Sequence, residues 1–366
     1  MRGRVRKFFW AVLILPLFLG ALTVTSFADS REEAQAKTDE LLSDFFEIVP
    51  DGLSDKAEAG AGALSIEAIL DDVLSAVRAG GASAGSFLFL LLGISLLLGA
   101  SGVALSDTGG TALGGITVVA SVGLLAALLP LVTEISEAFS AIGAFFSSLI
   151  PILASLIALS GGGATAAAAS SGMLLTLRVF GGICSALLPL SSAIFVGAAV
   201  SSINTDGFDT TLGAPRRWFV KGTGLLTALL GGFVAMQTSI ASATDSAAMR
   251  AAKYAATGTI PVVGQAVSGA LATLSGGLSY AGGVLGGGAV AVIVSLTVAP
   301  LVKLLLYRLC FFLSGLILDV FPQGVGGRCI SAMASALDGL IAVYSLGALI
   351  FVFEVVLAVR CSAHLI

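Results

Sequence analysis

The chain has 366 residues, of which 57% are hydrophobic and 11% charged, and its formal net charge is −4. Soluble domains carry about a quarter charged residues, so this composition excludes an ordinary soluble protein and indicates an integral membrane protein. The only histidine is His364, which excludes histidine-based metal sites, catalytic triads and proton relays. We therefore predict an all-α fold, a polytopic membrane helical bundle with a short exported helical region at its N-terminus.

The first 28 residues have the three parts of a signal peptide. A basic start is followed by an apolar stretch over 8–22, and small residues at 26 and 28 provide a cleavage position before Asp29. An uncleaved anchor is the alternative, because residues 8–25 are almost long enough to span a bilayer. In both cases residues 29–85 are predicted to lie outside the cytoplasm.

Residues 29–85 form an acidic region, since thirteen of the 22 acidic residues of the chain lie between Asp29 and Asp72. Two amphipathic helices are predicted here, and Gly80 and Gly81 are expected to end the second. Helices on a membrane surface usually have a basic polar face, so the acidic face favours contact with a protein; packing on the chain's own membrane body is the alternative. The predicted apolar faces comprise Ala34, Thr38, Leu41, Leu42, Phe45 and Val49 in the first helix, and Ile66, Ile69, Leu70, Val73, Leu74 and Val77 in the second.

Residues 86–366 are predicted to form a polytopic membrane domain with about 6–8 spans, because a hydrocarbon core of ~30 Å needs about 20 helical residues. Counting basic residues exposes a conflict: with the N-terminal region outside, seven crossings leave most basic residues outside as well. The conflict disappears if 173–200, which contains Pro189, is re-entrant. The basic loop 204–221 is then cytoplasmic. The seven long apolar stretches are 86–105, 112–133, 139–159, 173–200, 222–241, 284–302 and 337–359.

Residues 245–283 are predicted to form an interfacial helix followed by a re-entrant segment. Asp245 is expected to cap a helix that ends before Pro261, with Arg250 and Lys253 on one face. These two cations are predicted to bind either lipid headgroups or acidic residues of a partner.

Glycines, a proline and charges mark the later spans. The glycine-rich stretch 276–288 favours close helix packing, within the chain or between subunits, or a pore-lining hinge. Pro300 is predicted to kink the end of a span, and Lys303 to reach the headgroups at the cytoplasmic surface. Asp338 and Glu354 lie near the ends of the last apolar stretch and are predicted to be interfacial anchors.

Sequence motifs in this part of the chain resemble the stage III sporulation protein AE family of endospore-forming bacteria. The resemblance rests on Gln-Thr at 237–238 with Ala241, on Met-Arg-Ala-Ala-Lys-Tyr at 249–254, on Ile-Pro-Val-Val-Gly at 260–264 and on Ala-Pro-Leu-Val-Lys at 299–303. The plan of signal peptide, exported helices and polytopic body is also similar. The family-motif and candidate interaction residues are Asp245, Arg250, Lys253, Pro261, Gly264, Pro300 and Lys303.

The resemblance implies a membrane subunit of a transenvelope channel or secretion-like apparatus that links mother cell and forespore during endospore formation. It places the protein in the mother-cell membrane that engulfs the forespore. The implied partners are other stage III sporulation proteins, namely the AA ATPase and the AF, AG and AH ring-type subunits, and stage II sporulation protein Q. The acidic exported region would meet the ring subunits, and the basic loop around residues 216–218 would meet the ATPase.

The chain offers little support for catalysis. It contains neither a phosphate-binding GxxxxGK[ST] loop nor HExxH, so we predict a protein that is not an enzyme, with no catalytic, cofactor-binding or metal-binding residues and no cofactor. Membrane lipid is an expected partner and nucleic acid is not. The alternative is a stand-alone permease for a small solute or ion, although permeases are typically built from repeated halves and no convincing repeat is evident.

Overall fold

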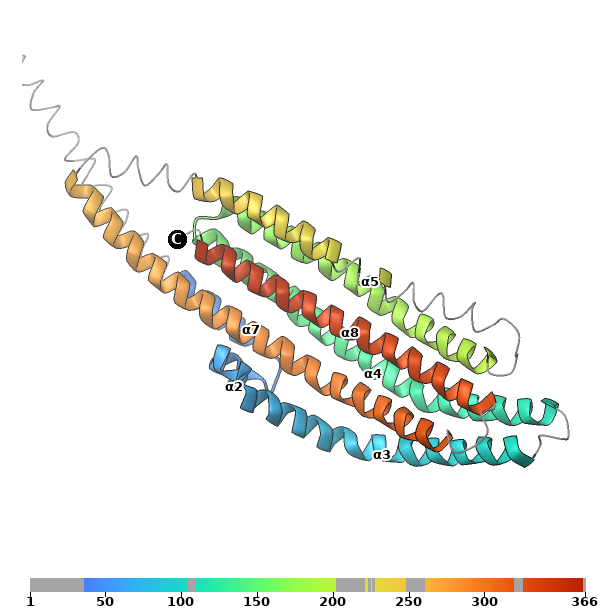
Figure 1. Ribbon diagram of the computed structural model, residues 1–366. Coiled ribbons are helices and arrows are strands. Elements are labelled where there is room, and N and C mark those ends of the chain that lie inside the picture. The colour runs from blue at the N-terminus through green and yellow to red at the C-terminus, as the bar shows by residue number, and fades with distance from the viewer. Residues whose placement is uncertain are drawn as a thin grey trace, which may run out of the picture.

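The computed structural model describes residues 36–104, 110–201, 221–222, 225, 228–247, 261–318 and 325–364, and within these residues all regular elements are helices (Figure 1). The all-α prediction is therefore confirmed. The predicted signal peptide, the basic loop, Arg250 and Lys253 lie outside the described residues. The elements are a helix over 36–48, α2 (Ser54–Ala59), the 3₁₀ helix η1 (Gly60–Leu64), α3 (Ile66–Ala104), α4 (Gly110–Leu159), α5 (Gly163–Ser201), a helix over 228–247, α7 (Pro261–Leu318) and α8 (Val325–His364).

The long helices lie side by side in one elongated bundle (Figure 1). Contacts such as Ser95 with Ser314 show that α3 and α7 run in the same direction. Contacts between the other helices show that α5 runs in the same direction as α3 and α7. Helix α4, the helix over 228–247 and α8 run in the opposite direction. Directions thus alternate along the chain, as in a protein that crosses a membrane repeatedly.

Five helical stretches of the described residues are long and apolar enough to cross a membrane, which supports an integral membrane protein. Several are longer than a bilayer requires. At 1.5 Å per residue, the 58 residues of α7 extend for about 87 Å, against a hydrocarbon core of ~30 Å. The five stretches are Ile66–Ser101, Gly115–Leu159, Gly163–Ile183, Tyr280–Leu318 and Cys329–Ser362.

Residues 112–133 and 139–159, predicted to be two spans, belong to the single helix α4, which continues through Pro130 and Pro151. Leu131 and Phe139 are buried on either side of the predicted break, so packing holds the helix together near Pro130, where proline removes a hydrogen bond. Because α4 is one helix and not two, the chain makes one crossing fewer before residue 204. This change places the basic stretch 204–221 on the cytoplasmic side, as the positive-inside rule requires.

Residues 173–200 were predicted to form a re-entrant segment with an interruption at Pro189. This prediction was wrong, because these residues lie within the continuous helix α5. The described part of the predicted element over 245–283 also differs from expectation. Residues 261–283 form the start of α7, and Pro261 is its first residue. The amide at this position has no hydrogen-bond partner within a helix, so proline is well tolerated there. Pro300 likewise lies inside α7, which continues to Leu318 instead of ending nearby.

Of the two predicted amphipathic helices, the first is confirmed. Leu41 and Phe45 are buried in the bundle, so this helix packs on the chain's own membrane body. The second does not end at Gly80 and Gly81 but continues within α3 to Ala104. Gly80 is buried against α7, where a Cβ atom would make an ordinary contact with Leu306 Cδ1 at 3.4 Å.

The face of α3 that meets α7 is not the predicted apolar face. Asp72, Ala76 and Gly80 point inward. The outward face carries a line of four aliphatic residues, which we call the α3 apolar row. Its members and their exposed fractions are Ile66 (78%), Leu70 (53%), Leu74 (51%) and Val77 (38%).

Aromatic rings from three helices form the centre of the bundle, and we call them the aromatic core. The ring centroids of Phe139 and Tyr344 are 5.4 Å apart, and those of Phe146 and Phe351 are 4.8 Å apart. The members are Phe139 and Phe146 of α4, Phe180 of α5, and Tyr344 and Phe351 of α8.

The glycine-rich stretch packs within the chain. A Cβ atom at Gly286 would lie 2.5 Å from Val359 Cγ2, and one at Gly282 would lie 3.5 Å from Ser362 Oγ. Gly286 therefore lets α7 and α8 approach each other closely, and Gly282 lies at the same helix contact. Of the alternatives, the structure supports intramolecular packing at these two positions.

Candidate interaction site at the N-terminal junction

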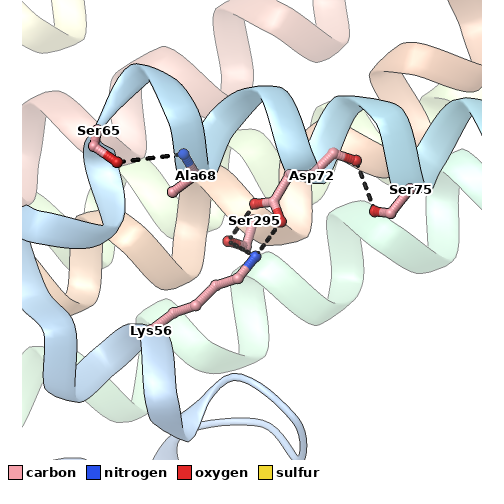
Figure 2. A network of polar contacts seen from close by, with 6 residues as sticks. All are labelled: Lys56, Ser65, Ala68, Asp72, Ser75 and Ser295. Atoms are coloured by element: carbon pink, nitrogen blue, oxygen red, sulfur yellow. Dashed lines mark hydrogen bonds and ion pairs between the residues drawn. The ribbon is translucent and has the colours of Figure 1, made fainter.

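A polar network joins α2, α3 and α7 (Figure 2). The Lys56 ammonium forms an ion pair with Asp72 and donates a hydrogen bond to Ser295 Oγ at 3.1 Å. Ser295 Oγ in turn donates to Asp72 Oδ2 at 3.2 Å. Each of the three side chains therefore contacts the other two, and 239 residues of sequence separate Lys56 from Ser295.

Glycine permits the same elements to pack closely beside this network. A Cβ atom at Gly288 of α7 would lie 2.7 Å from the Ala57 carbonyl oxygen and 3.0 Å from the Phe45 ring. Both Phe45 and Ala57 are fully buried. We call these contacts, together with Lys56, Asp72 and Ser295, the N-terminal junction.

Local sequence explains how the chain turns into this junction. Gly60 ends α2 with a φ of +54°, a conformation that favours glycine. Ser65 then precedes α3, and its Oγ accepts a hydrogen bond from the Ala68 amide at 3.3 Å, as an N-cap residue does. The Ser75 hydroxyl bonds to the Asp72 carbonyl at 2.8 Å, one turn back along α3.

The junction fixes a strongly acidic segment to the bundle. Residues 36–77 contain ten acidic and two basic residues. One of the two basic residues, Lys56, is engaged with Asp72. The exposed surface of the segment is therefore predominantly negative.

Two further ion pairs link the long helices. Lys303 of α7 pairs with Glu134 of α4, so its predicted contact with lipid headgroups is replaced by a contact within the protein. Arg308 approaches Asp338 with both ends of the carboxylate engaged, Nε to Oδ1 at 2.5 Å and Nη2 to Oδ2 at 3.3 Å. A planar guanidinium suits this two-point contact.

Asp245 caps a helix, but not the one that was predicted. It lies within the helix over 228–247, and its carboxylate accepts hydrogen bonds from the backbone amide and the hydroxyl of Thr165, each at 2.7 Å, near the start of α5. The Ala164 amide is 3.4 Å from the other oxygen. A carboxylate at a helix N-terminus satisfies free amides and opposes the helix dipole.

Glu354 is not the interfacial anchor that its position near a segment end predicted. It is 1% exposed, and one carboxyl oxygen bonds with the hydroxyl of Thr176 on α5. The other oxygen, Oε2, has no hydrogen-bond partner among the described residues. Asp338, in contrast, is exposed and forms an ion pair with Arg308, and its predicted interfacial position stays a prediction.

The predicted site residues do not gather at one place. Asp245 lies at the start of α5 and Lys303 against α4, whereas Pro261 and Gly264 belong to the first turns of α7. Within the described ranges no group of three or more His, Cys, Asp or Glu side chains is placed to hold a metal ion. The contacts that Asp245 and Lys303 make join one helix to another.

The comparisons with known proteins agree with the motif resemblance. The sequence model of the stage III sporulation protein AE family matches residues 43–362. This chain belongs to that family. A curated relative, stage III sporulation protein AE of Bacillus subtilis (strain 168), is 25% identical over 224 residues, which cover 59% of this chain and 55% of the relative. The match thus spans little more than half of the relative's length, and no solved structure matches the chain.

Proposed function

We propose that this sporulation membrane protein is a non-enzymatic subunit of a transenvelope channel or secretion-like apparatus between mother cell and forespore. Family membership supports the role in sporulation. The proposal adds the apparatus, the mother-cell membrane and the partners, which are the AA ATPase, the AF, AG and AH subunits and stage II sporulation protein Q.

The observation that carries the proposal is the N-terminal junction. An ion pair, a serine and a close contact at Gly288 fix the acidic segment to the long helices. Such a segment suits a subunit that has to present a defined surface to proteins between two membranes.

The directions of the helices support contacts on both sides of the membrane. Residues 36–64 pack against the part of α7 near Gly288 and Ser295. Helix α5 (Gly163–Ser201) ends at the opposite end of the bundle (Figure 1). With the acidic segment outside the cytoplasm, the chain enters the basic stretch 204–221 on the cytoplasmic side, where the ATPase would bind.

Affinity purification of the tagged full-length chain from sporulating cells tests the proposal. We expect the AA, AF, AG and AH proteins to co-purify with it, and a fluorescent fusion to label the membrane around the forespore. Arg216→Glu with Arg217→Glu is expected to weaken recovery of the ATPase while the protein still inserts into membranes. Recovery of the tagged chain without any of these proteins contradicts the proposal.

A stand-alone permease is the second candidate, and one observation favours it. Ion-driven transporters hold carboxyl groups inside the membrane, and Glu354 is such a group, with one oxygen unpartnered among the described residues. Purified protein in liposomes separates the two functions. A cation or proton flux that Glu354→Gln abolishes would support the permease, whereas the apparatus subunit is expected to show none on its own.

A further inference from the structure

The α3 apolar row is an apolar surface on an acidic part of the molecule. Its exposed fractions range from 38% at Val77 to 78% at Ile66. Glu67 and Asp71 are exposed and lie beside the row on the same helix. The row extends over eleven residue steps, about three helical turns or 16 Å, and so matches the length of a short amphipathic helix.

The charges of α3 distinguish the part that carries this row from the rest of the helix. The helix has 39 residues, about 58 Å, whereas a span needs about 20 residues. Residues 79–104 contain no charged side chain, while Glu67, Asp71, Asp72 and Arg78 all precede them. The uncharged part is long enough to span a bilayer by itself, and the row precedes it.

The row is also held rigidly. Asp72 lies on the opposite side of α3 and is engaged by Lys56 and Ser295. Two turns further along α3, Gly80 is buried beside Leu306 of α7. A surface held in one orientation costs less to bind than one that must first become ordered.

Charge decides which occupant fits the row. Residues 36–77 carry ten acidic and two basic residues, so a second copy would bring like charges together, which disfavours self-association. A surface of anionic lipids is negative as well and would repel the segment. A partner with basic residues beside an apolar strip satisfies both the row and the charges around it.

We propose that the α3 apolar row is the docking surface for an amphipathic segment of another protein, with lysine or arginine flanking its apolar face. This deepens the proposed function, on which it rests, by assigning one partner contact to Ile66–Val77. The aliphatic side chains provide buried area, and Glu67 and Asp71 attract and orient the basic segment.

The first test uses the full-length chain in nanodiscs of neutral lipid and a fluorescent helical peptide of lysine and leucine as the probe. We expect saturable binding that weakens with salt. Leu70→Ser with Leu74→Ser, and separately Glu67→Lys with Asp71→Lys, should each raise the Kd by about tenfold or more, since two leucines or two charges are removed from the contact. Asp44→Lys with Glu47→Lys makes the same change of charge on the neighbouring helix and should have a smaller effect. Equal affinity for all variants would overturn the proposal.

The second test places a photo-cross-linking amino acid at position 70 in sporulating cells. We expect an adduct whose partner peptide combines apolar residues with lysine or arginine, and which disappears in the Glu67→Lys, Asp71→Lys background. An adduct with a second copy, an adduct with lipid, or no adduct overturns the proposal. If the Leu70→Ser, Leu74→Ser protein co-purifies with the stage III proteins as the unchanged chain does, the docking surface fails while the proposed function stands. If the unchanged chain recovers none of them, the proposed function fails.

Discussion

The aromatic core and the N-terminal junction hold helices together in different ways. In the aromatic core, five rings from α4, α5 and α8 interlock, and all are at most 4% exposed. In the junction, the ion pair between Lys56 and Asp72 is partly exposed, and Gly288 provides the closest backbone approach. The first contact is apolar and enclosed, and the second is polar and reaches the surface.

This difference indicates that the fold depends on the aromatic core, whereas the N-terminal junction positions the surface of the acidic segment. Ring packing excludes water and leaves no room for an added atom, so damage there should affect the whole bundle. A partly exposed ion pair contributes little to stability, so damage at the junction should mainly change how the acidic segment sits. The four predictions below test this division.

The largest effect is expected at Gly347 of α8, which faces Phe139 of the aromatic core. A Cβ atom there would lie 2.0 Å from Phe139 Cζ, so Gly347→Ala forces a ring out of place and should lower stability by about 3 kcal/mol. Thermal unfolding of the purified protein in detergent measures the change. Gly315→Ala is the matched control, because nothing lies within 4 Å of that position. Equal melting temperatures for the two variants would show that the aromatic core tolerates rearrangement.

The next effect concerns the buried carboxyl group close to these rings. Thr176→Val removes the only described hydrogen-bond partner of Glu354 and should cost about 1–3 kcal/mol, the penalty for an unsatisfied buried polar group. Thr297→Val is the control, since the hydroxyl of Thr297 bonds to the Ile293 carbonyl of its own helix. Unfolding in detergent should separate the two, and a control that is as unstable as Thr176→Val would count against a special role for this contact.

At the junction, Gly288→Ala should detach the N-terminal segment and leave the bundle folded. The added methyl would meet the Ala57 carbonyl at 2.7 Å, a backbone atom that cannot turn aside. Limited proteolysis between residues 48 and 54 should become at least several-fold faster, with little change in melting temperature. Gly283→Ala, beside open space, should leave the cleavage rate unchanged. Protection equal to that of the unchanged protein would mean that the junction adapts.

The smallest effect is expected at the ion pair. Lys56→Met retains most of the apolar length of the side chain and leaves Asp72 bonded to Ser295, so we expect a loss of ~0.2–1 kcal/mol. A double-mutant cycle with Asp72→Asn measures the coupling between the two side chains. A coupling well above 1 kcal/mol would place the junction, like the aromatic core, among the contacts on which the fold depends.

The fold class and the first amphipathic helix were predicted correctly because they depend on local pattern. The apolar spacing that ends at Val49 buries Leu41 and Phe45 as expected. The second amphipathic helix shows the limit of that reasoning. Its buried side is decided by α7, and sequence spacing alone does not indicate that Asp72 would meet Lys56 and Ser295 there.

Helix ends were the least predictable part. Gly80 lies inside α3, and Pro130 and Pro300 lie inside α4 and α7. A glycine or proline weakens a helix only by an amount that packing against neighbours can offset. The candidate site was missed for a related reason, since its residues come from three separate segments and form no motif. The one signal in the sequence was a charge, Asp72, between the apolar positions Ile69 and Val73 of the second amphipathic helix.

The pairing of α3 with α7 has a consequence for how the protein is made. Helices α4 and α5, and likewise α7 and α8, are neighbours in sequence and meet as soon as both have left the ribosome. The partner of α3 is synthesised about 200 residues later. Until then Ser95 and Asp72 lack the serines that they contact in the finished bundle. Assembly of the chain in the membrane therefore ends with a step that joins its beginning to its last pair of helices.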